Sequence, residues 1–212
     1  MSSSASASAA TQPESRVGLP WLEWGVAARP RPGEDVSGDA AVVEVTRETA
    51  LIAAVDGLGH GPAAADAADR ATAVLRGAAG EHADVLVERC HTALRGTRGA
   101  AIGIATLDRD RLSWAGVGNV EAWLFSVSTP PAALFLRPGV VGHALPPPQP
   151  AAITLRRGDV LVLVSDGVGR AFVEDFHAAG TPQQLANRIL AEHAREADDA
   201  VVVVVRYLGR AG

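Results

Sequence analysis

The stretch ALIAAVDGLGHGPAAADAADRATAVLRG (50–77) joins an apolar run to a helical pattern through a glycine-rich loop. The residues up to Asp56 are typical of a strand, since they are a short apolar run bounded by glycine. Pro62 suits the first turn of a helix, and the alanine-rich segment after it predicts that helix. The stretch therefore predicts a strand that ends in a carboxylate, followed by a loop and a helix.

Regular patterns continue on both sides of this stretch. Two strand-like runs precede it, WLEWGVAA (21–28) and DAAVVEV (39–45), and an amphipathic helix pattern follows it, ADVLVERCHTALRG (83–96). Further strand-like runs are GAAIGIATLD (99–108), RLSWAGVGN (111–119), EAWLFSV (121–127), AALFLR (132–137), ITL (153–155) and DVLVLVSDG (159–167). Thr181, Pro182 and Gln184 form a capping-box signature before a third helix, QQLANRILAEHARE (183–196). The valine-rich end, ADDAVVVVVRYL (197–208), predicts a buried strand.

This order of elements predicts an α+β protein. Many strands joined by tight turns favour two antiparallel sheets packed face to face, and the helices would cover their outer faces. The expected architecture is a four-layer α-β-β-α sandwich. We expect residues 1–15, which are rich in serine and alanine, to form a disordered tail, and residues 16–212 to form a single domain.

The composition excludes several function classes. All 19 basic residues are arginine, because the sequence contains no lysine, so Schiff-base lysine chemistry and a Walker-type lysine are excluded. The formal net charge of −5 argues against nucleic-acid or anionic-membrane binding. No apolar run reaches membrane-spanning length and the first residues do not resemble a secretory signal, so we expect a cytoplasmic protein. The single cysteine, Cys90, excludes an intramolecular disulfide and is expected in the core.

Four aspartates lie at the edges of strand-like runs: Asp39, Asp56, Asp166 and Asp198. If these strand ends meet at one edge of the sandwich, the carboxylates form a cluster that needs cations to offset the like-charge repulsion. Carboxylate and carbonyl oxygens, without paired histidines or further cysteines, suit Mg²⁺ or Mn²⁺. The glycines of DGLGHG (56–61) would let the backbone approach an ion or anion closely, and the Gly57 carbonyl is a further candidate ligand. One Asp-Gly pair is usually a turn, so the prediction depends on the combination.

Five motifs together resemble a known family. SGDA (37–40), VDGLGHG (55–61), GVGNVEAWLF (116–125), SDGVGR (165–170) and DDAVVVVV (198–205) resemble the metal-dependent PPM (type-2C) protein serine/threonine phosphatases, and within them the SpoIIE branch. WGVAARPRPGEDVSGD (24–39) together with GVGNVEAWLF (116–125) most resembles the stand-alone stressosome phosphatases of the RsbX type. The resemblance implies a β-sandwich flanked by helices and two Mn²⁺ or Mg²⁺ ions. It places these ions on Asp56, the Gly57 carbonyl, Asp166 and Asp198, with Asp39 as a direct or water-mediated contributor.

The sequence departs from eukaryotic members of the family at two points. Their motif histidine follows the metal aspartate by two residues, but Leu58 takes that place here and His60 lies four residues after Asp56. Three roles for His60 therefore stay open: a general acid, a structural residue of the loop, or a contact with metal-bound water. The phosphate-binding arginine of those members has no matching position here. Arg29 and Arg31 are the arginine candidates for phosphate binding, with solvated loop residues as the alternative interpretation, and His60 is a third phosphate-binding candidate.

The resemblance implies hydrolysis of phosphoserine or phosphothreonine by a metal-activated water, without a covalent phosphoenzyme. It implies phosphorylated STAS-domain proteins of a stressosome as partners. Two alternatives stay open. One is a non-catalytic binding module of the same fold, and the other is a metal-dependent phosphohydrolase that acts on nucleotides, although no aromatic-rich segment suggests a base pocket.

Overall fold

The computed structural model describes residues 21–147 and 149–209. Its strands are β1 (Leu22–Arg29), β2 (Asp39–Val45), β3 (Thr49–Gly57), β4 (Ala100–Asp108), β5 (Arg111–Val117), β6 (Glu121–Ser126), β7 (Thr129–Ala133), β8 (Leu136–Arg137), β9 (Ala151–Thr154), β10 (Val160–Val164) and β11 (Ala200–Tyr207). Its helices are α1 (Pro62–Leu75), α2 (Ala83–Ala93), α3 (Pro182–His193) and the short 3-10 helix η1 (Arg170–Val173). The tail expected over residues 1–15 lies outside the described residues.

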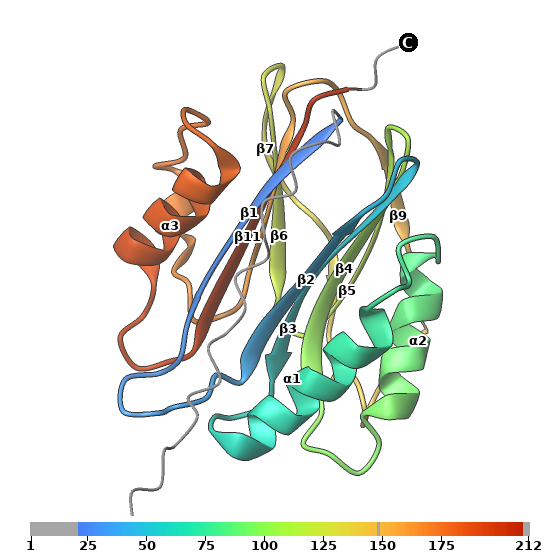
Figure 1. Ribbon diagram of the computed structural model, residues 1–212, viewed down its shortest axis with the longest axis vertical. Coiled ribbons are helices and arrows are strands. Elements are labelled where there is room, and N and C mark those ends of the chain that lie inside the picture. Colours follow the sequence, from blue (N-terminus) through green and yellow to red (C-terminus); the bar gives the residue numbers. More distant parts are fainter. Residues whose placement is uncertain (1–20, 148, 210–212) are drawn as a thin grey trace, which may run out of the picture.

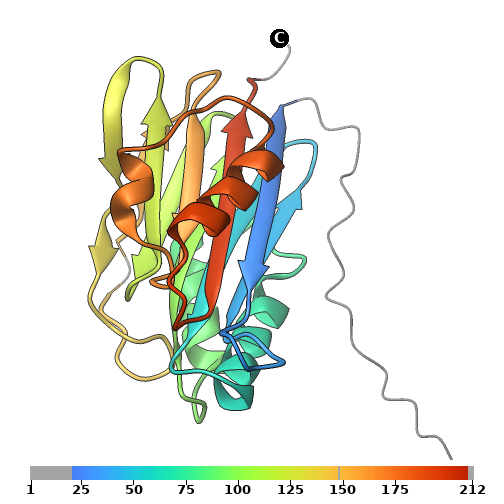
Figure 2. The same cartoon turned by 90° about the vertical axis from the view of Figure 1, so that its left-hand side faces the viewer.

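The strands form two sheets, and Figures 1 and 2 show them packed face to face with helices on both outer faces. One sheet has the order β1-β11-β10-β6-β7, and the other has the order β2-β3-β4-β5-β8, with β9 paired to β5. Helix α3 covers the first sheet, whereas α1 and α2 cover the second. The predicted four-layer α-β-β-α sandwich is therefore confirmed. All strand pairs are antiparallel except the short pair β5–β8, which is parallel.

Strand β3 shows how the sequence builds this core. Leu51, Ala53 and Val55 pack under α1 and α2. The alternating positions Ala50, Ile52 and Ala54 pack between the two sheets. Since successive side chains of a strand point to opposite faces, a stretch buried on both faces must be apolar, as residues 50–55 of β3 and 200–205 of β11 are.

The N-terminus of α3 and the run at residues 132–137 differ in how well their structure follows from the sequence. The capping box of α3 is confirmed, since the Gln184 N–H donates to Thr181 Oγ1 and the Gln184 side chain accepts from the Thr181 N–H. The run AALFLR (132–137) was expected as one strand, and that prediction is wrong. The chain leaves one sheet at the end of β7 and enters the other at β8, because Leu134 is buried between the sheets while Phe135 is 66% exposed.

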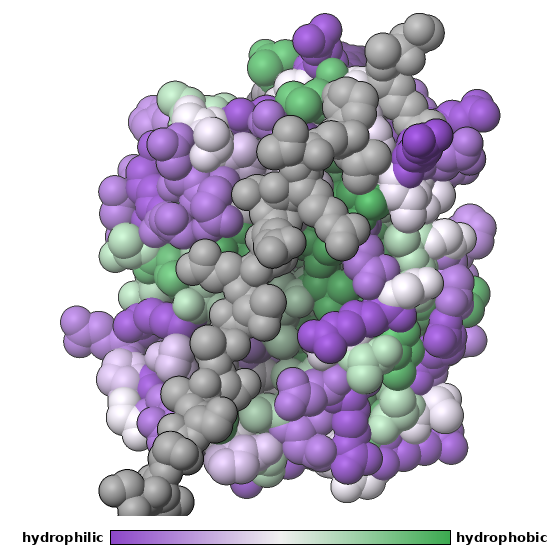
Figure 3. Space-filling view, viewed as in Figure 1, coloured by the Kyte–Doolittle hydropathy of each residue, from purple (hydrophilic) through white to green (hydrophobic). Residues whose placement is uncertain are grey.

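The surface seen in Figure 3 is mostly hydrophilic over the helices, with apolar surface between the two helix layers, where the edge strands β1 and β2 lie. Half-buried side chains of these strands, among them Trp24, Val26 and Val43, pack against the inter-sheet core. No helix in the described part of the chain is long and apolar enough to cross a lipid bilayer.

Candidate metal centre

The second sheet contributes two carboxylates from adjacent strands. Asp39 is the first residue of β2 and Asp56 lies next to the last of β3, and the two residues face each other in the antiparallel register. Asp39 is only 8% exposed. Its Oδ2 is buried and has no hydrogen-bond partner within the described residues. A buried, unpaired carboxylate oxygen is costly, so Asp39 has coordination capacity that the protein itself does not use.

The first sheet brings two more carboxylates to the same edge. Asp166 follows the end of β10, and Asp198 precedes the start of β11, its antiparallel neighbour. Asp166 hydrogen-bonds with Asp56 of the other sheet, and Asp198 is close enough to raise the pKa of both Asp39 and Asp56. The structure therefore brings together the four aspartates predicted from the sequence. We call Asp39, Asp56, Asp166 and Asp198 the carboxylate cluster.

Burial and mutual repulsion disfavour full ionisation of this cluster. Burial raises the pKa of Asp39 to about 7, assisted by the nearby charges of Asp199, Asp166 and Asp198 and opposed by a hydrogen bond with Ser165. Burial also raises the pKa of Asp56 to about 9, with Asp39 and Asp166 as the next causes. Protons and divalent cations both relieve this repulsion, and a cluster of hard oxygen donors suits Mg²⁺ or Mn²⁺. The residues present therefore fit a divalent metal centre.

The carboxylates are not arranged for coordination as they stand. Among the residues that the structure describes, no three His, Cys, Asp or Glu side chains are placed so that together they could hold a metal ion. Asp166 is exposed and Asp198 half-buried, so part of the cluster faces solvent. Such an edge leaves coordination positions for water or substrate, as catalytic metal sites require.

The glycines of DGLGHG are explained by packing and backbone conformation. A Cβ on Gly57 would lie 2.2 Å from the Ala64 carbonyl oxygen, so only glycine lets β3 pass under the start of α1. Gly59 and Gly61 have φ angles of +88° and +71°, which disfavour other residues. The Gly57 N–H donates to the Gly38 carbonyl, next to Asp39, and so ties the two metal-candidate segments together.

His60 lies in the loop after β3, four residues after Asp56, and pairs with a residue outside the carboxylate cluster. Its Nδ1 contacts Oε1 of Glu34, a residue of the β1–β2 loop, and its side chain is 53% exposed. This contact favours the structural role among the alternatives for His60, because it connects the loop after β3 to the loop before β2.

The two arginine candidates are placed differently. Arg29 ends β1 opposite Ala200, and its Nη2 donates to the Arg195 carbonyl at 2.5 Å. Its guanidinium therefore binds a backbone carbonyl in the segment that follows α3, and it does not bind any aspartate that the structure describes. Arg31 donates its backbone N–H to Asp199, and its side chain has no hydrogen bond or ion pair within the described residues.

Sequence reasoning missed three polar residues that position the cluster. Asp199 is 3% exposed, and its two oxygens accept the backbone N–H groups of Arg31 and Gly38, both at 2.8 Å. Asn119 donates its side-chain amide to Asp166 Oδ2. Ser165 Oγ accepts the Val201 N–H at 3.0 Å and also hydrogen-bonds with Asp39. All three lie inside the quoted motifs, but a motif does not tell which of its polar residues faces an ion and which faces the backbone.

The sandwich with acidic strand ends between its sheets defines the class: its fold is that of the PP2C-type phosphatases. A solved structure of RsbX in complex with magnesium has a TM-score of 0.82, with 19% identity over 90% of this chain and 97% of that chain. A structure described as "The bacterial stressosome: a modular system that has been adapted to control secondary messenger signaling" has a TM-score of 0.80, with 31% identity over 87% of this chain and 99% of that chain.

The sequence comparisons identify the branch. The family profile described as Stage II sporulation protein E (SpoIIE) matches residues 46–210, so the chain belongs to the SpoIIE family. The phosphoserine phosphatase RsbX of Bacillus subtilis (strain 168) is 24% identical over 141 residues, which are 64% of this chain and 69% of RsbX. The resemblance inferred from the motifs is thereby confirmed.

Proposed function

We propose that this chain is a metal-dependent phosphatase that hydrolyses phosphoserine or phosphothreonine in proteins. The observation that carries the proposal is the carboxylate cluster with the buried, unpartnered Oδ2 of Asp39 and the raised pKa of Asp39 and Asp56. The names of its relatives support the same activity, since RsbX is described as a phosphoserine phosphatase and a neighbour of known structure contains magnesium.

In this proposal Asp39, Asp56, Asp166, Asp198 and the Gly57 carbonyl hold Mg²⁺ or Mn²⁺, with two ions as the expected number. Ions bound by these residues would supply Lewis-acid polarisation of a phosphate oxygen and a lowered pKa for the water that serves as nucleophile. The protein contributes position: Asn119 orients Asp166, Ser165 orients Asp39, and Asp199 anchors the loop that leads into Asp39.

The one cysteine supports a mechanism without a thiol nucleophile. Cys90 is fully buried between α2 and the second sheet, and burial raises the pKa of its thiol to about 12. A protonated thiol without solvent access cannot attack a phosphate ester. Hydrolysis by a metal-activated water needs no such nucleophile.

For the physiological substrate we propose phosphorylated STAS-domain proteins of a stressosome, in the cytoplasm. The proposal is supported by the similarity to RsbX and to the structure described under the bacterial stressosome. The test is phosphate release from a phosphorylated STAS-domain protein, a phosphoserine peptide and nucleoside triphosphates, each with Mn²⁺, Mg²⁺ or EDTA. Metal-dependent release from the two phosphorylated protein substrates supports the proposal. Release from nucleotides alone, or from nothing, would instead favour the nucleotide hydrolase or the binding module.

A further inference from the structure

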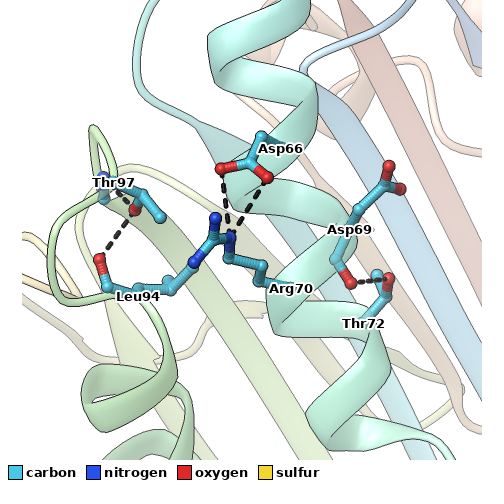
Figure 4. Close-up of polar contacts among 7 residues, drawn as sticks. Asp66, Asp69, Arg70, Thr72, Leu94 and Thr97 are labelled. Carbon is cyan, nitrogen blue, oxygen red and sulfur yellow. Dashed lines mark hydrogen bonds and ion pairs between the residues drawn. The ribbon is translucent and has the colours of Figure 1, made fainter.

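The loop between α2 and β4 (residues 94–99) is a rigid turn held by Thr97. The Thr97 hydroxyl donates to the Leu94 carbonyl at 2.7 Å and accepts the Gly99 N–H at 3.0 Å. Figure 4 shows Thr97 turned toward Leu94, the residue that follows α2, and also draws the Asp66–Arg70 ion pair within α1. Both neighbours of Arg98 are therefore fixed by hydrogen bonds.

Contacts from the opposite side hold the same turn. His143 Nε2 lies 3.1 Å from the Thr97 carbonyl oxygen. Gly99 has a φ of +80°, and a Cβ there would lie 2.7 Å from the Val141 carbonyl oxygen. A turn packed this closely presents Arg98 from a fixed backbone, which lowers the entropic cost of using its side chain for binding.

Arg98 points across the loop that follows Asp56. Gly57 pairs with Ala100, and the Leu58 N–H donates to the Gly99 carbonyl at 3.0 Å, so Arg98 continues β4 opposite Gly59. Its Nη1 lies 2.6 Å from the position that a Cβ of Gly59 would occupy. Gly59 follows Asp56 by three residues in the bend after β3, so the two residues are at most about 11 Å apart.

The guanidinium of Arg98 is free to bind a ligand. It is exposed and makes no hydrogen bond or ion pair within the described part of the chain. Two other arginines near the cluster differ, since Arg29 is bound to the Arg195 carbonyl and Arg170 is paired with Glu121 at 2.7 Å. The side chain of Arg31 is also unpaired within the described residues, but it is half-buried whereas Arg98 is exposed. A guanidinium matches a phosphate with two parallel N–H donors, and here it would also offset the negative charge that the carboxylates present to an incoming dianion.

We propose that Arg98 is a phosphate-binding residue that holds the phosphoryl group of the substrate at the rim of the carboxylate cluster. This inference rests on the proposed function, and it assigns to the α2–β4 turn a role that Arg29, held by Arg195, does not fill. Glycine at position 59 then has a second use, because any side chain there would occupy the space that the guanidinium crosses.

The test compares Arg98→Ala, Arg98→Lys and the control Arg95→Ala with the unchanged chain. Arg95 is an exposed arginine three residues earlier, in the same loop just after α2. We measure KM and kcat for p-nitrophenyl phosphate and a phosphoserine peptide, the inhibition constant of inorganic phosphate, and Mn²⁺ binding by calorimetry. For Arg98→Ala we expect KM and the phosphate inhibition constant to rise about tenfold or more, as for the loss of a charge-assisted hydrogen bond. For Arg98→Lys, we expect both constants to lie between those of Arg98→Ala and the unchanged chain. Arg95→Ala should leave both constants unchanged, and none of the variants should change the affinity for Mn²⁺.

Three results would overturn the inference. One is an unchanged phosphate inhibition constant in Arg98→Ala. Another is a KM that rises for the peptide but not for p-nitrophenyl phosphate, which would indicate contact with the protein part of the substrate. The third is weakened Mn²⁺ binding in Arg98→Ala, which would indicate a structural role. If the unchanged chain releases no phosphate from any substrate, the proposed function itself is wrong. If the unchanged chain is active but one of these three results is found, only the role of Arg98 in phosphate binding is wrong.

Discussion

Among the single residues of the site, Asp39 carries the clearest penalty to folding stability. Its carboxylate is almost wholly buried, faces Asp56 across the β2–β3 pair and leaves one oxygen unpartnered. A residue in this position opposes folding unless a cation or a proton offsets its charge. Proteins often retain such strained charges where function requires them, at some expense of stability.

This reasoning predicts opposite effects of Asp39→Asn on stability and on metal binding. Without metal at pH 8, the substitution removes a buried charge and should raise the free energy of unfolding by about 1–3 kcal/mol. The same protein should bind Mn²⁺ more weakly. Urea unfolding in EDTA and calorimetry measure the two effects, with Asp35→Asn in the exposed part of the β1–β2 loop as the control. A loss of stability in EDTA would show that the Asp39 charge is instead paired in the native protein.

At the scale of elements, the β1–β2 loop (residues 30–38) links the two sheets and leads into the cluster. Asp199 fastens both ends of this loop to the start of β11 through the N–H groups of Arg31 and Gly38. Glu34, in the middle of the loop, contacts His60. A single carboxylate therefore aligns a segment from each sheet, and its pairing with backbone explains why Asp198 rather than Asp199 is the metal candidate.

Asp199→Ala tests this anchoring. Two N–H donors would lose a charged acceptor, so we expect a loss of about 2 kcal/mol in the free energy of unfolding. Hydrogen exchange at the Arg31 and Gly38 amides should accelerate while the amides of β11 stay protected. The anchoring role would be contradicted if these two amides exchange at the rate of the unchanged chain. Asp35→Ala, in the same loop, is the matched control.

At the scale of the whole molecule, the raised pKa values of Asp39, to about 7, and Asp56, to about 9, couple folding to pH. The usual pKa of an aspartate is 3.8. Between pH 3.8 and about 9, the native protein therefore holds protons on Asp39 and Asp56 that the unfolded chain releases. The free energy of unfolding of the metal-free protein should therefore fall as pH rises through this interval. Metal ions compete with those protons, so Mn²⁺ affinity should rise over the same interval.

Unfolding in EDTA at pH 5.5, 7 and 8.5 measures this dependence. We expect the stability to decrease in that order and the decrease to shrink in Asp39→Asn. Calorimetry in two buffers of different ionisation enthalpy should show protons released when Mn²⁺ binds. Stability that increases steadily from pH 5.5 to 8.5 without metal would contradict the electrostatic account of the cluster.

Much of this architecture was predictable because the residues of each element indicate whether it is a strand or a helix and how deeply it is buried. The apolar runs of β3 and β11, the capping box of α3 and the aspartates at strand ends can be recognised from local sequence pattern and alternation alone. The switch between β7 and β8 was not predictable, since it depends on which sheet buries Leu134. Asp199 was missed because its partners, the N–H groups of Arg31 and Gly38, lie far away in the sequence. Arg98 was missed because only the pairing of the chain after β3 with the chain before β4 places it opposite Gly59.

The central claim is that the carboxylate cluster binds divalent ions that make the chain a phosphatase. Its most direct test is phosphate release from a phosphoserine peptide against Mn²⁺ concentration, for the unchanged chain, Asp56→Asn and the control Asp108→Asn, an exposed carboxylate at the far end of β4. We predict saturable, Mn²⁺-dependent release that Asp56→Asn reduces at least about 100-fold and Asp108→Asn leaves unchanged. Equal release by Asp56→Asn and the unchanged chain, or release that persists in EDTA, would contradict the claim.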